Sequence, residues 1–345
     1  MITHQRNYQE NPRFRAHRIL LGMHTISLIN YKGGVGKTTL TANLGTELAF
    51  RGYKVLLIDL DPQASLTFSL VFPSVWDKDC RESRTIKNWF EALTNNNLSL
   101  RFADLIVQPA KVNKRIKDWG GAGSVSLVCS HLGLISLDME LAVLVIGANP
   151  RQSALNFLQT HTHLRSGLES VSDDYDFIFF DCPANFNIST QSGIIASDFY
   201  IIPAIPDYLS ILGIDQLEVQ VKRLVEDYNH YAEFLEDRIL INPKRLGVVF
   251  TMLSLYGKSP IAVQKAYIAK VRQKHIPYFN SFIRENKTVY GIAPEIGIPV
   301  SLQASNKKNN QLVRAELENF ADEFLKLINQ KIRKTNQYPT CEQKT

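Results

Sequence analysis

The sequence has few cysteines, and their spacing fits no common metal-binding or disulfide framework. There are only four in 345 residues, at Cys80, Cys129, Cys182 and Cys341, and no two of them form a C-x-x-C pair. Disulfide frameworks and zinc or iron–sulfur sites need cysteines at short, regular spacings. The spacing therefore argues against such sites and favours reduced thiols in a cytosol.

Long apolar runs are also missing. No run approaches the ~18 apolar residues that a membrane-spanning helix requires, and residues 1–18 are polar, without the apolar centre of a signal peptide. With 45% hydrophobic and 21% charged residues, the composition is that of a globular chain. We therefore expect a soluble, cytoplasmic protein that folds without disulfides.

Half of the net charge lies ahead of the first expected strand. The chain carries a net charge of +6, and residues 1–23 contain four arginines and one glutamate, which gives +3. We expect this stretch to be a disordered basic extension, which either binds polyanions or is simply solvated. Residues 24–335 are expected to form a single domain, followed by a tail over residues 336–345.

A glycine-rich stretch, Asn-Tyr-Lys-Gly-Gly-Val-Gly-Lys-Thr-Thr, covers residues 30–39. An apolar run precedes it, and leucines at every fourth position follow it, so it joins a strand to a helix. In that context glycines let backbone N–H groups converge on an anion at a helix N-terminus. The expected nucleotide contacts are Gly33, Gly34, Val35, Gly36, Lys37, Thr38 and Thr39.

Two residues of this stretch have specific expected roles. Lys37 would contact the β- and γ-phosphates of a nucleotide, and the hydroxyl of Thr38 would hold Mg²⁺. The alternative is a flexible glycine turn with two solvated lysines.

One position departs from the general phosphate-loop pattern. The first glycine of that pattern is replaced by Tyr31, and a second lysine, Lys32, follows it. The form Lys-Gly-Gly-x-Gly-Lys-Thr resembles the deviant Walker A loop of the ParA/MinD class of ATPases. In that class the extra lysine reaches the nucleotide of a partner subunit. The resemblance therefore implies that Lys32 acts with Lys37 in catalysis and that ATP produces a homodimer.

Two carboxylates follow the second apolar strand pattern, residues 54–60. Asp59 ends this run, and Asp61 begins an Asp-Pro-Gln turn. Carboxylates at the C-terminal ends of parallel strands lie where open α/β sheets bind ligands. By the family resemblance, Asp61 would position or activate the attacking water, and Asp59 would support the Mg²⁺ shell.

A further carboxylate, Asp181, ends the apolar run 176–181, which has the Walker B pattern. We expect it to contact Mg²⁺ through water. Locally, a core strand ending in a helix-capping aspartate would fit equally well. Pro183 and Asn185 resemble the family's corresponding segment and favour the metal role.

The remaining strand patterns, at residues 125–130, 199–204 and 247–252, alternate with helical ones. This predicts an α/β fold of the P-loop NTPase type, a doubly wound and mostly parallel sheet with helices on both faces. Residues 72–124 are hard to interpret and are expected to hold an inserted or mobile subregion. His131 is expected to be structural, because no serine or cysteine constellation accompanies it.

The resemblance is weaker after Gly257. In relatives the strand over residues 247–252 lies near the adenine, so Thr251 and Met252 are pocket candidates. Ser259-Pro260 has the N-cap and N1 pattern of a helix that would run to about Lys274. The segment from Ser281 onwards, through residues 293–300, looks like the family's last strand region.

Basic residues are concentrated late in the chain. Residues 244–287 contain nine lysines and arginines and one acidic residue, Glu285. Such a run favours nonspecific DNA binding, although a solvated basic face is the alternative. The candidate DNA contacts are Lys222, Arg223, Lys258, Lys265, Lys270, Arg272 and Lys274.

The resemblance implies an ATP- and Mg²⁺-dependent dimer that hydrolyses ATP slowly and binds DNA. With a ParB-like or cargo-adaptor partner, it would partition plasmids or chromosomes or position other cargo. DNA binding would place it on the nucleoid. Three alternatives remain: a MinD-like membrane regulator, which the acidic last helix (residues 311–332) disfavours, an iron protein or metal-cluster carrier, and an ATP-gated scaffold with negligible hydrolysis.

Overall fold

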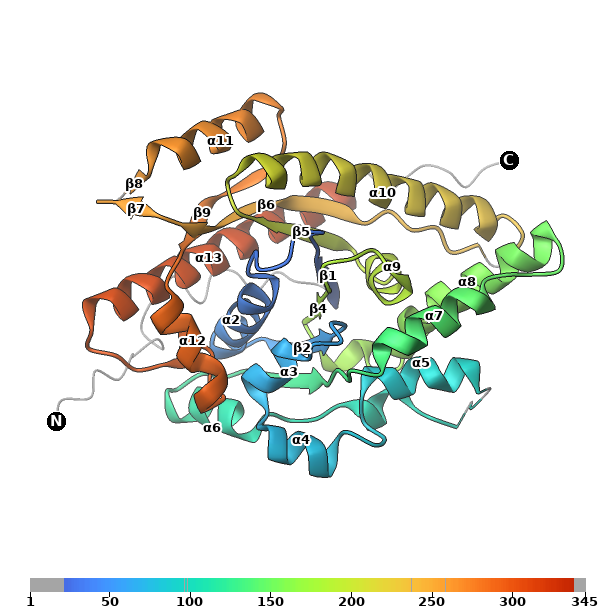
Figure 1. Ribbon diagram of the computed structural model, residues 1–345. Helices are drawn as coiled ribbons and strands as arrows, with labels where there is room; N and C mark the ends of the chain where they lie inside the picture. Colours follow the sequence, from blue (N-terminus) through green and yellow to red (C-terminus); the bar gives the residue numbers. More distant parts are fainter. Residues whose placement is uncertain (1–21, 96, 98, 237, 258, 338–345) are drawn as a thin grey trace.

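The computed structural model describes residues 22–337, except residues 96, 98, 237 and 258. Seven strands form one sheet with the order β3-β2-β4-β1-β5-β6-β9, and all its neighbouring strands are parallel (Figure 1). The strands are β1 (His24–Leu28), β2 (Lys54–Asp59), β3 (Ser124–Val128), β4 (Phe177–Asp181), β5 (Phe199–Ala204), β6 (Lys244–Leu253) and β9 (Tyr278–Arg284).

Alternating side chains of the strands build two apolar clusters, one on each face of the sheet. In β4, Phe177 and Phe179 join one cluster, and Ile178 and Phe180 join the other. All four are fully buried. A strand covered on both faces can be apolar throughout, which is why these segments are continuous apolar runs in the sequence.

Helices cover both faces of the sheet. The cluster that contains Phe177 includes side chains from α2 (Lys37–Phe50), α3 (Ser65–Leu70), α6 (Ala110–Asp118), α12 (Lys287–Ile296) and α13 (Lys308–Gln337). The cluster that contains Ile178 includes side chains from α5 (Ile86–Thr94), α7 (Leu134–Leu144), α8 (Pro150–Glu169), α9 (Ile188–Ile195), α10 (Tyr208–Ala232) and α11 (Ala262–Gln273). The predicted doubly wound α/β fold is confirmed.

The last helix, α13, packs on the sheet. Phe320 and Phe324 are fully buried, and the ring of Phe324 lies 5.6 Å from the rings of both Phe177 and Phe179. Its acidic residues also bond inward, since the Glu323 carboxylate accepts hydrogen bonds from the backbone N–H groups of Asn280 and Ser281. Within residues 22–337, apart from the four gaps, no helix combines the length and hydropathy needed to cross a membrane.

The predicted helix start at Ser259-Pro260 was wrong. These two residues form a short strand, β8 (Ser259–Pro260), that pairs antiparallel with β7 (Leu255–Tyr256). Gly257, with a φ of 65°, lies in the turn between them. The helix, α11, begins at Ala262, because pairing with β7 outweighs the local capping preference.

Helix α10 begins at Tyr208, directly after the capping residue Asp207. The assignment of residues 293–300 to a last strand region was also wrong. Residues 287–296 form α12, which ends at Gly297 in the left-handed conformation, and η4 (Val300–Leu302) follows. Only residues 281–284 of that segment lie in a strand, β9.

Residues 72–124 pack against the body of the molecule. They form α4 (Pro73–Asp79), α5, η2 (Phe102–Leu105) and α6, and they contribute side chains to both apolar clusters. That this region is an insertion stays a prediction, as does the division into extension, domain and tail. Residues 1–21 of the basic extension and residues 338–345 of the tail lie outside the described part of the chain.

Candidate nucleotide and metal site

The phosphate loop connects β1 to α2 at the C-terminal edge of the sheet. Gly34 and Gly36 have φ angles of 71° and 84°, and Gly36 is the residue from which α2 begins. Since a side chain is strained at such angles, glycine is required at both positions. The Thr251 hydroxyl donates a 2.7 Å hydrogen bond to the carbonyl of Val35, which fixes the loop to β6.

Lys37 lies inside this loop. Only 7% of the residue is exposed, and its Nζ donates to the carbonyls of Asn30 (3.1 Å) and Lys32 (3.4 Å). Burial lowers the pKa of Lys37, while the carboxylates of Asp181 and Asp61 oppose this shift. A largely buried ammonium at a helix N-terminus favours an anionic ligand such as a phosphate.

Asp59 and Asp181 stand side by side at the ends of β2 and β4, where they occupy paired positions of the two strands. Both are fully buried. Burial, with Asp181 as its neighbour, raises the pKa of Asp59, and burial raises the pKa of Asp181 to about 7. A bound divalent cation would favour the ionised form of both carboxylates.

The residues near this pair fit a Mg²⁺ ion in a nucleotide site. The Thr38 hydroxyl donates a 2.7 Å hydrogen bond to Asp181 Oδ2, so a hydroxyl and a carboxylate meet at the start of α2. Oxygen donors are the ligands that Mg²⁺ prefers, together with phosphates and water. Among the residues that the structure describes, no group of three or more His, Cys, Asp and Glu side chains is arranged to hold a metal.

The Asp59 carboxylate is hydrogen-bonded within its own turn and to the start of α3. Its Oδ1 accepts from the N–H of Asp61 (3.1 Å), and its Oδ2 accepts from the N–H and hydroxyl of Thr67 (2.8 and 2.7 Å). Both carboxylate oxygens therefore hold the turn that carries Asp61. A role of Asp59 in the Mg²⁺ shell stays a prediction.

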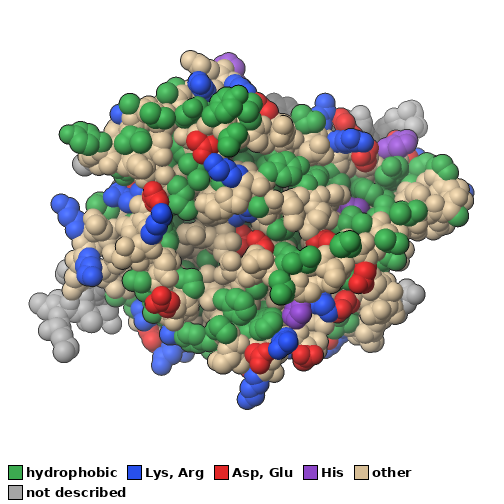
Figure 2. Space-filling model, viewed as in Figure 1, with side chains coloured by type: hydrophobic (Ala, Val, Ile, Leu, Met, Phe, Trp, Pro, Cys, Tyr) green, Lys and Arg blue, Asp and Glu red, His purple; other side chains and the backbone are tan. Residues whose placement is uncertain are grey.

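Asp61 follows β2 on the same edge as the phosphate loop. Its Oδ1 accepts from the N–H of Gln63 at 2.9 Å, and the residue is only partly buried. The structure thus brings Lys37, Thr38, Asp61 and Asp181 together around one loop. Figure 2 shows this face of the molecule, with acidic side chains near its centre and hydrophobic side chains around them.

Lys32 does not point into its own phosphate loop. Its ammonium pairs with the carboxylate of Asp207, the residue that caps the N-terminus of α10 through the N–H of Ser210. Burial opposes ionisation of Asp207, but the hydrogen bonds from Lys32 and Ser210 outweigh it and lower its pKa. About a third of each side chain remains exposed, 33% for Lys32 and 37% for Asp207.

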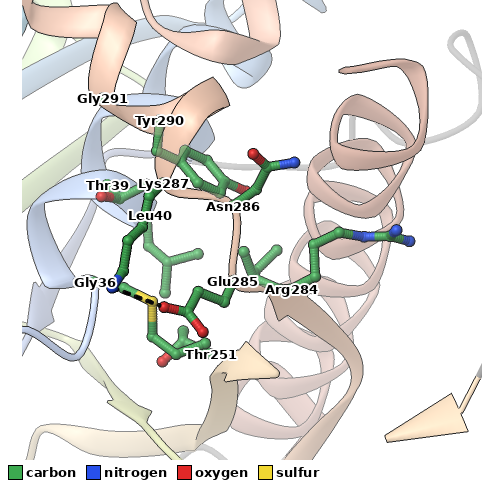
Figure 3. A pocket seen from close by; sticks show the side chains of 12 residues that line it. Gly36, Thr39, Leu40, Thr251, Arg284, Glu285, Asn286, Lys287, Tyr290 and Gly291 are labelled. Carbon is green, nitrogen blue, oxygen red and sulfur yellow. Dashed lines mark ion pairs between the residues drawn. The ribbon is translucent and has the colours of Figure 1, made fainter. Parts of the chain in front are cut away.

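A cavity of about 380 Å³ opens beside the start of α2. It is lined by Gly36, Thr39 and Leu40, by the predicted Thr251 and Met252, and by residues from β9, from α12 and from the junction between them, namely Ile283, Arg284, Glu285, Asn286, Lys287, Tyr290 and Gly291. Figure 3 shows the Tyr290 ring on one side of the cavity, while the Arg284 guanidinium points away towards α13. There it pairs with Glu316 at 2.6 Å.

The β9 and α12 residues of this cavity were missed by sequence reasoning. The only signal was that the resemblance to the family is weaker after Gly257. Tyr290 is notable because its hydroxyl is buried and has no hydrogen-bond partner among the described residues. Burial raises its pKa, so the hydroxyl stays protonated and available as a donor.

The candidate DNA contacts lie on α10 and α11 and, for Lys274, directly after α11; Lys258 is outside the described residues. All six described ones are exposed. Acidic neighbours offset several of them, because Lys222 pairs with Glu226 (3.6 Å), Arg223 with Asp227 (3.7 Å) and Lys274 with Asp215. The net positive charge around the candidate contacts is therefore smaller than the number of lysines and arginines among them.

Comparisons with known proteins agree with this geometry. The AAA domain model matches residues 23–234. The sporulation initiation inhibitor protein Soj of Bacillus subtilis is 30% identical over 256 residues, which covers 73% of this chain and 83% of that protein. The chromosome-partitioning ATPase Soj of Treponema pallidum is 29% identical over 280 residues, covering 80% of this chain and 88% of that protein.

A solved structure supports the fold. The apo McdA of Cyanothece superposes with a TM-score of 0.64 at 21% identity, covering 89% of this chain and 99% of that one. The family model covers more than half of the sequence and includes the phosphate loop and both carboxylate-bearing strand ends. The chain therefore belongs to the AAA-domain family of P-loop ATPases, as a ParA-type ATPase related to the Soj proteins.

Proposed function

We propose that this chain dimerises when it binds ATP, hydrolyses the ATP slowly, and partitions or positions a cargo together with a partner protein that stimulates hydrolysis. The observation that carries the proposal is the direction of Lys32. Lys37 occupies the loop of its own subunit, while the Lys32 side chain, a third of which is exposed, lies outside that loop with its ammonium paired to Asp207. A lysine in that place can reach a nucleotide held by a second copy.

The nucleotide would lie along α2 and the cavity beside it. Its phosphates would accept hydrogen bonds from the loop N–H groups and from Lys37. Thr38 and Asp181 would hold Mg²⁺, which neutralises charge on the β- and γ-phosphates. The base would enter the cavity next to Gly36, which Tyr290 and Asn286 help to line.

Hydrolysis would depend on Asp61, which lies at the edge of the site without a bond to Thr38 or Lys37 in the described structure. A carboxylate there can orient a water towards the γ-phosphate. Release of phosphate from Mg²⁺-ATP separates this proposal from an ATP-gated scaffold. We expect measurable turnover that requires Mg²⁺, and the absence of any turnover would favour the scaffold.

Nonspecific DNA binding is part of the proposal and would use the exposed cations of α10 and α11. ATP would be needed because a dimer brings two such surfaces onto one duplex. Binding by phosphate contacts is independent of sequence and falls steeply with salt. The logarithm of the binding constant falls with the logarithm of the salt concentration with a slope of about −0.9 per phosphate contact. Since several of these cations already pair with acids, we expect weak binding by each subunit.

Reversing three of these charges tests the DNA surface. We expect Lys222→Glu, Lys270→Glu and Lys274→Glu together to reduce DNA affinity at least tenfold, measured by fluorescence anisotropy with Mg²⁺-ATP at low salt. ATP-dependent dimerisation should be unchanged. The matched control reverses three exposed lysines on α6, Lys111, Lys114 and Lys117, and should retain binding. Equal affinity in the two triple variants would exclude this surface as the DNA site.

A further inference from the structure

Ser130, two residues after the end of β3, is bonded to the turn that carries Asp61. Its hydroxyl donates a 2.6 Å hydrogen bond to the backbone carbonyl of Asp61. Ser130 is itself held at both ends, because its N–H donates to the Thr67 hydroxyl (2.9 Å) and its carbonyl accepts from Trp76 Nε1 (3.1 Å). It is fully buried, so it cannot contact a nucleotide directly.

Thr67 completes the connection on the other side of the turn. Its hydroxyl accepts from the N–H of Ser130 and donates to Asp59 Oδ2, while Asp59 Oδ1 accepts from the N–H of Asp61. The N–H of Asp61 is therefore bound through Asp59 and Thr67, and its carbonyl through Ser130. Both backbone polar groups of Asp61 take part in one closed set of hydrogen bonds, and its carbonyl also accepts from the N–H of Ala64 within the turn (2.8 Å).

We propose that Ser130 and Thr67 are positioning residues for hydrolysis, which set the direction of the Asp61 carboxylate without touching the substrate. The proposal rests on the role of Asp61 in the proposed function. A misplacement of about 1 Å in a group that orients a reactant can cost about 100-fold in rate. Ground-state binding of ATP depends on the phosphate loop, so it should not depend on these two hydroxyls.

Substitution of the two hydroxyls tests the proposal by separating turnover from binding. Ser130→Ala removes the bond to the Asp61 carbonyl, and Thr67→Val removes the hydroxyl at nearly constant volume. We expect each to lower kcat about 10-fold to 100-fold and to leave the Kd for Mg²⁺-ATP within about threefold of its original value. Thr67→Ser, which keeps the hydroxyl, should restore most of the turnover.

Controls come from buried hydroxyls elsewhere. Thr46→Val removes a fully buried hydroxyl on α2 that bonds to Ala42 and Ser301, and Ser197→Ala removes one that bonds to Gly193 and Ser27. If loss of any buried hydroxyl slowed the enzyme, these variants would lose as much kcat. We expect them to change thermal stability alone.

A double variant shows whether Ser130 acts through Asp61. Added to Asp61→Ala, Ser130→Ala should cause no further loss of the residual turnover, because the group that it positions is gone. An additional loss of the same factor would overturn the proposal, as would unchanged kcat in the two single variants. If Thr67→Val does not fold, Ser130→Ala decides. A wild-type level of turnover in Asp61→Ala would instead overturn the proposed role of Asp61, and this inference with it.

Discussion

Lys37→Ala should abolish nucleotide binding. The ammonium lies within the phosphate loop, bonded to two of its carbonyls, and is almost completely buried. A bound nucleotide would receive charge-assisted hydrogen bonds from it, each worth about 1.5–3 kcal/mol. The loss of two such bonds is about 3–6 kcal/mol, which weakens affinity by at least about 100-fold.

The measurement is equilibrium binding of a fluorescent ATP analogue in the presence of Mg²⁺. Lys54→Ala is the matched control, because Lys54 is an exposed lysine at the start of β2, the end of the strand opposite to Asp59. The control should bind normally. If Lys37→Ala bound the analogue as tightly as the control, the nucleotide would not lie in this loop.

Asp61→Ala should show the opposite pattern, with binding retained and turnover lost. The carboxylate lies beside the loop. Among the hydrogen bonds that the structure describes, its two oxygens take part in one alone, which they accept from the N–H of Gln63 in the same turn. General acid–base or water-orienting groups contribute about 10²–10⁴-fold to rate, so we expect kcat to fall by at least about 100-fold. The Kd for Mg²⁺-ATP should change by less than about threefold.

Phosphate release and analogue binding, measured on the same preparation, separate the two effects. Loss of an interaction that is made only in the transition state lowers kcat and kcat/KM together and leaves the affinity for the bound substrate unchanged. A loss of affinity in Asp61→Ala equal to that in Lys37→Ala would contradict the separate roles. It would assign Asp61 to the binding of the nucleotide or its metal.

The fold and the centre of the site could be predicted because their signals are local in the sequence. A buried parallel strand is a continuous apolar run, and its C-terminal carboxylate is the next polar residue, as at Asp59 and Asp181. The phosphate loop is ten consecutive residues, so its residue types and spacing are readable directly. These features need no knowledge of which distant segments meet.

Features that depend on distant segments could not be predicted. The cavity beside α2 is completed by Tyr290 and Asn286, which are about 250 residues away in the chain from the loop that they face. The pairing of Lys274 with Asp215 and of Arg284 with Glu316 offsets charges that appeared unbalanced in the sequence. The bond between Lys32 and Asp207 likewise joins segments 175 residues apart.

The β7–β8 hairpin shows a different reason for failure. Ser259-Pro260 has a good local helix-start pattern, and the backbone nevertheless pairs with Leu255 and Tyr256. The N–H of Ile261 also donates to the carbonyl of Ser254 at 3.0 Å. Hydrogen bonds within this short hairpin thus outweighed a capping preference that is worth only about 1 kcal/mol.

The most direct test of the ATP-dependent dimer is the molar mass of the chain and of Lys32→Ala, measured by light scattering with Mg²⁺ and a slowly hydrolysed ATP analogue. The unsubstituted chain should have the mass of a dimer with the analogue and of a monomer without it. Lys32→Ala should bind the analogue and remain a monomer, because the lysine that reaches the second nucleotide is missing. A normal dimer of Lys32→Ala, or a nucleotide-independent mass of the unsubstituted chain, would contradict the account.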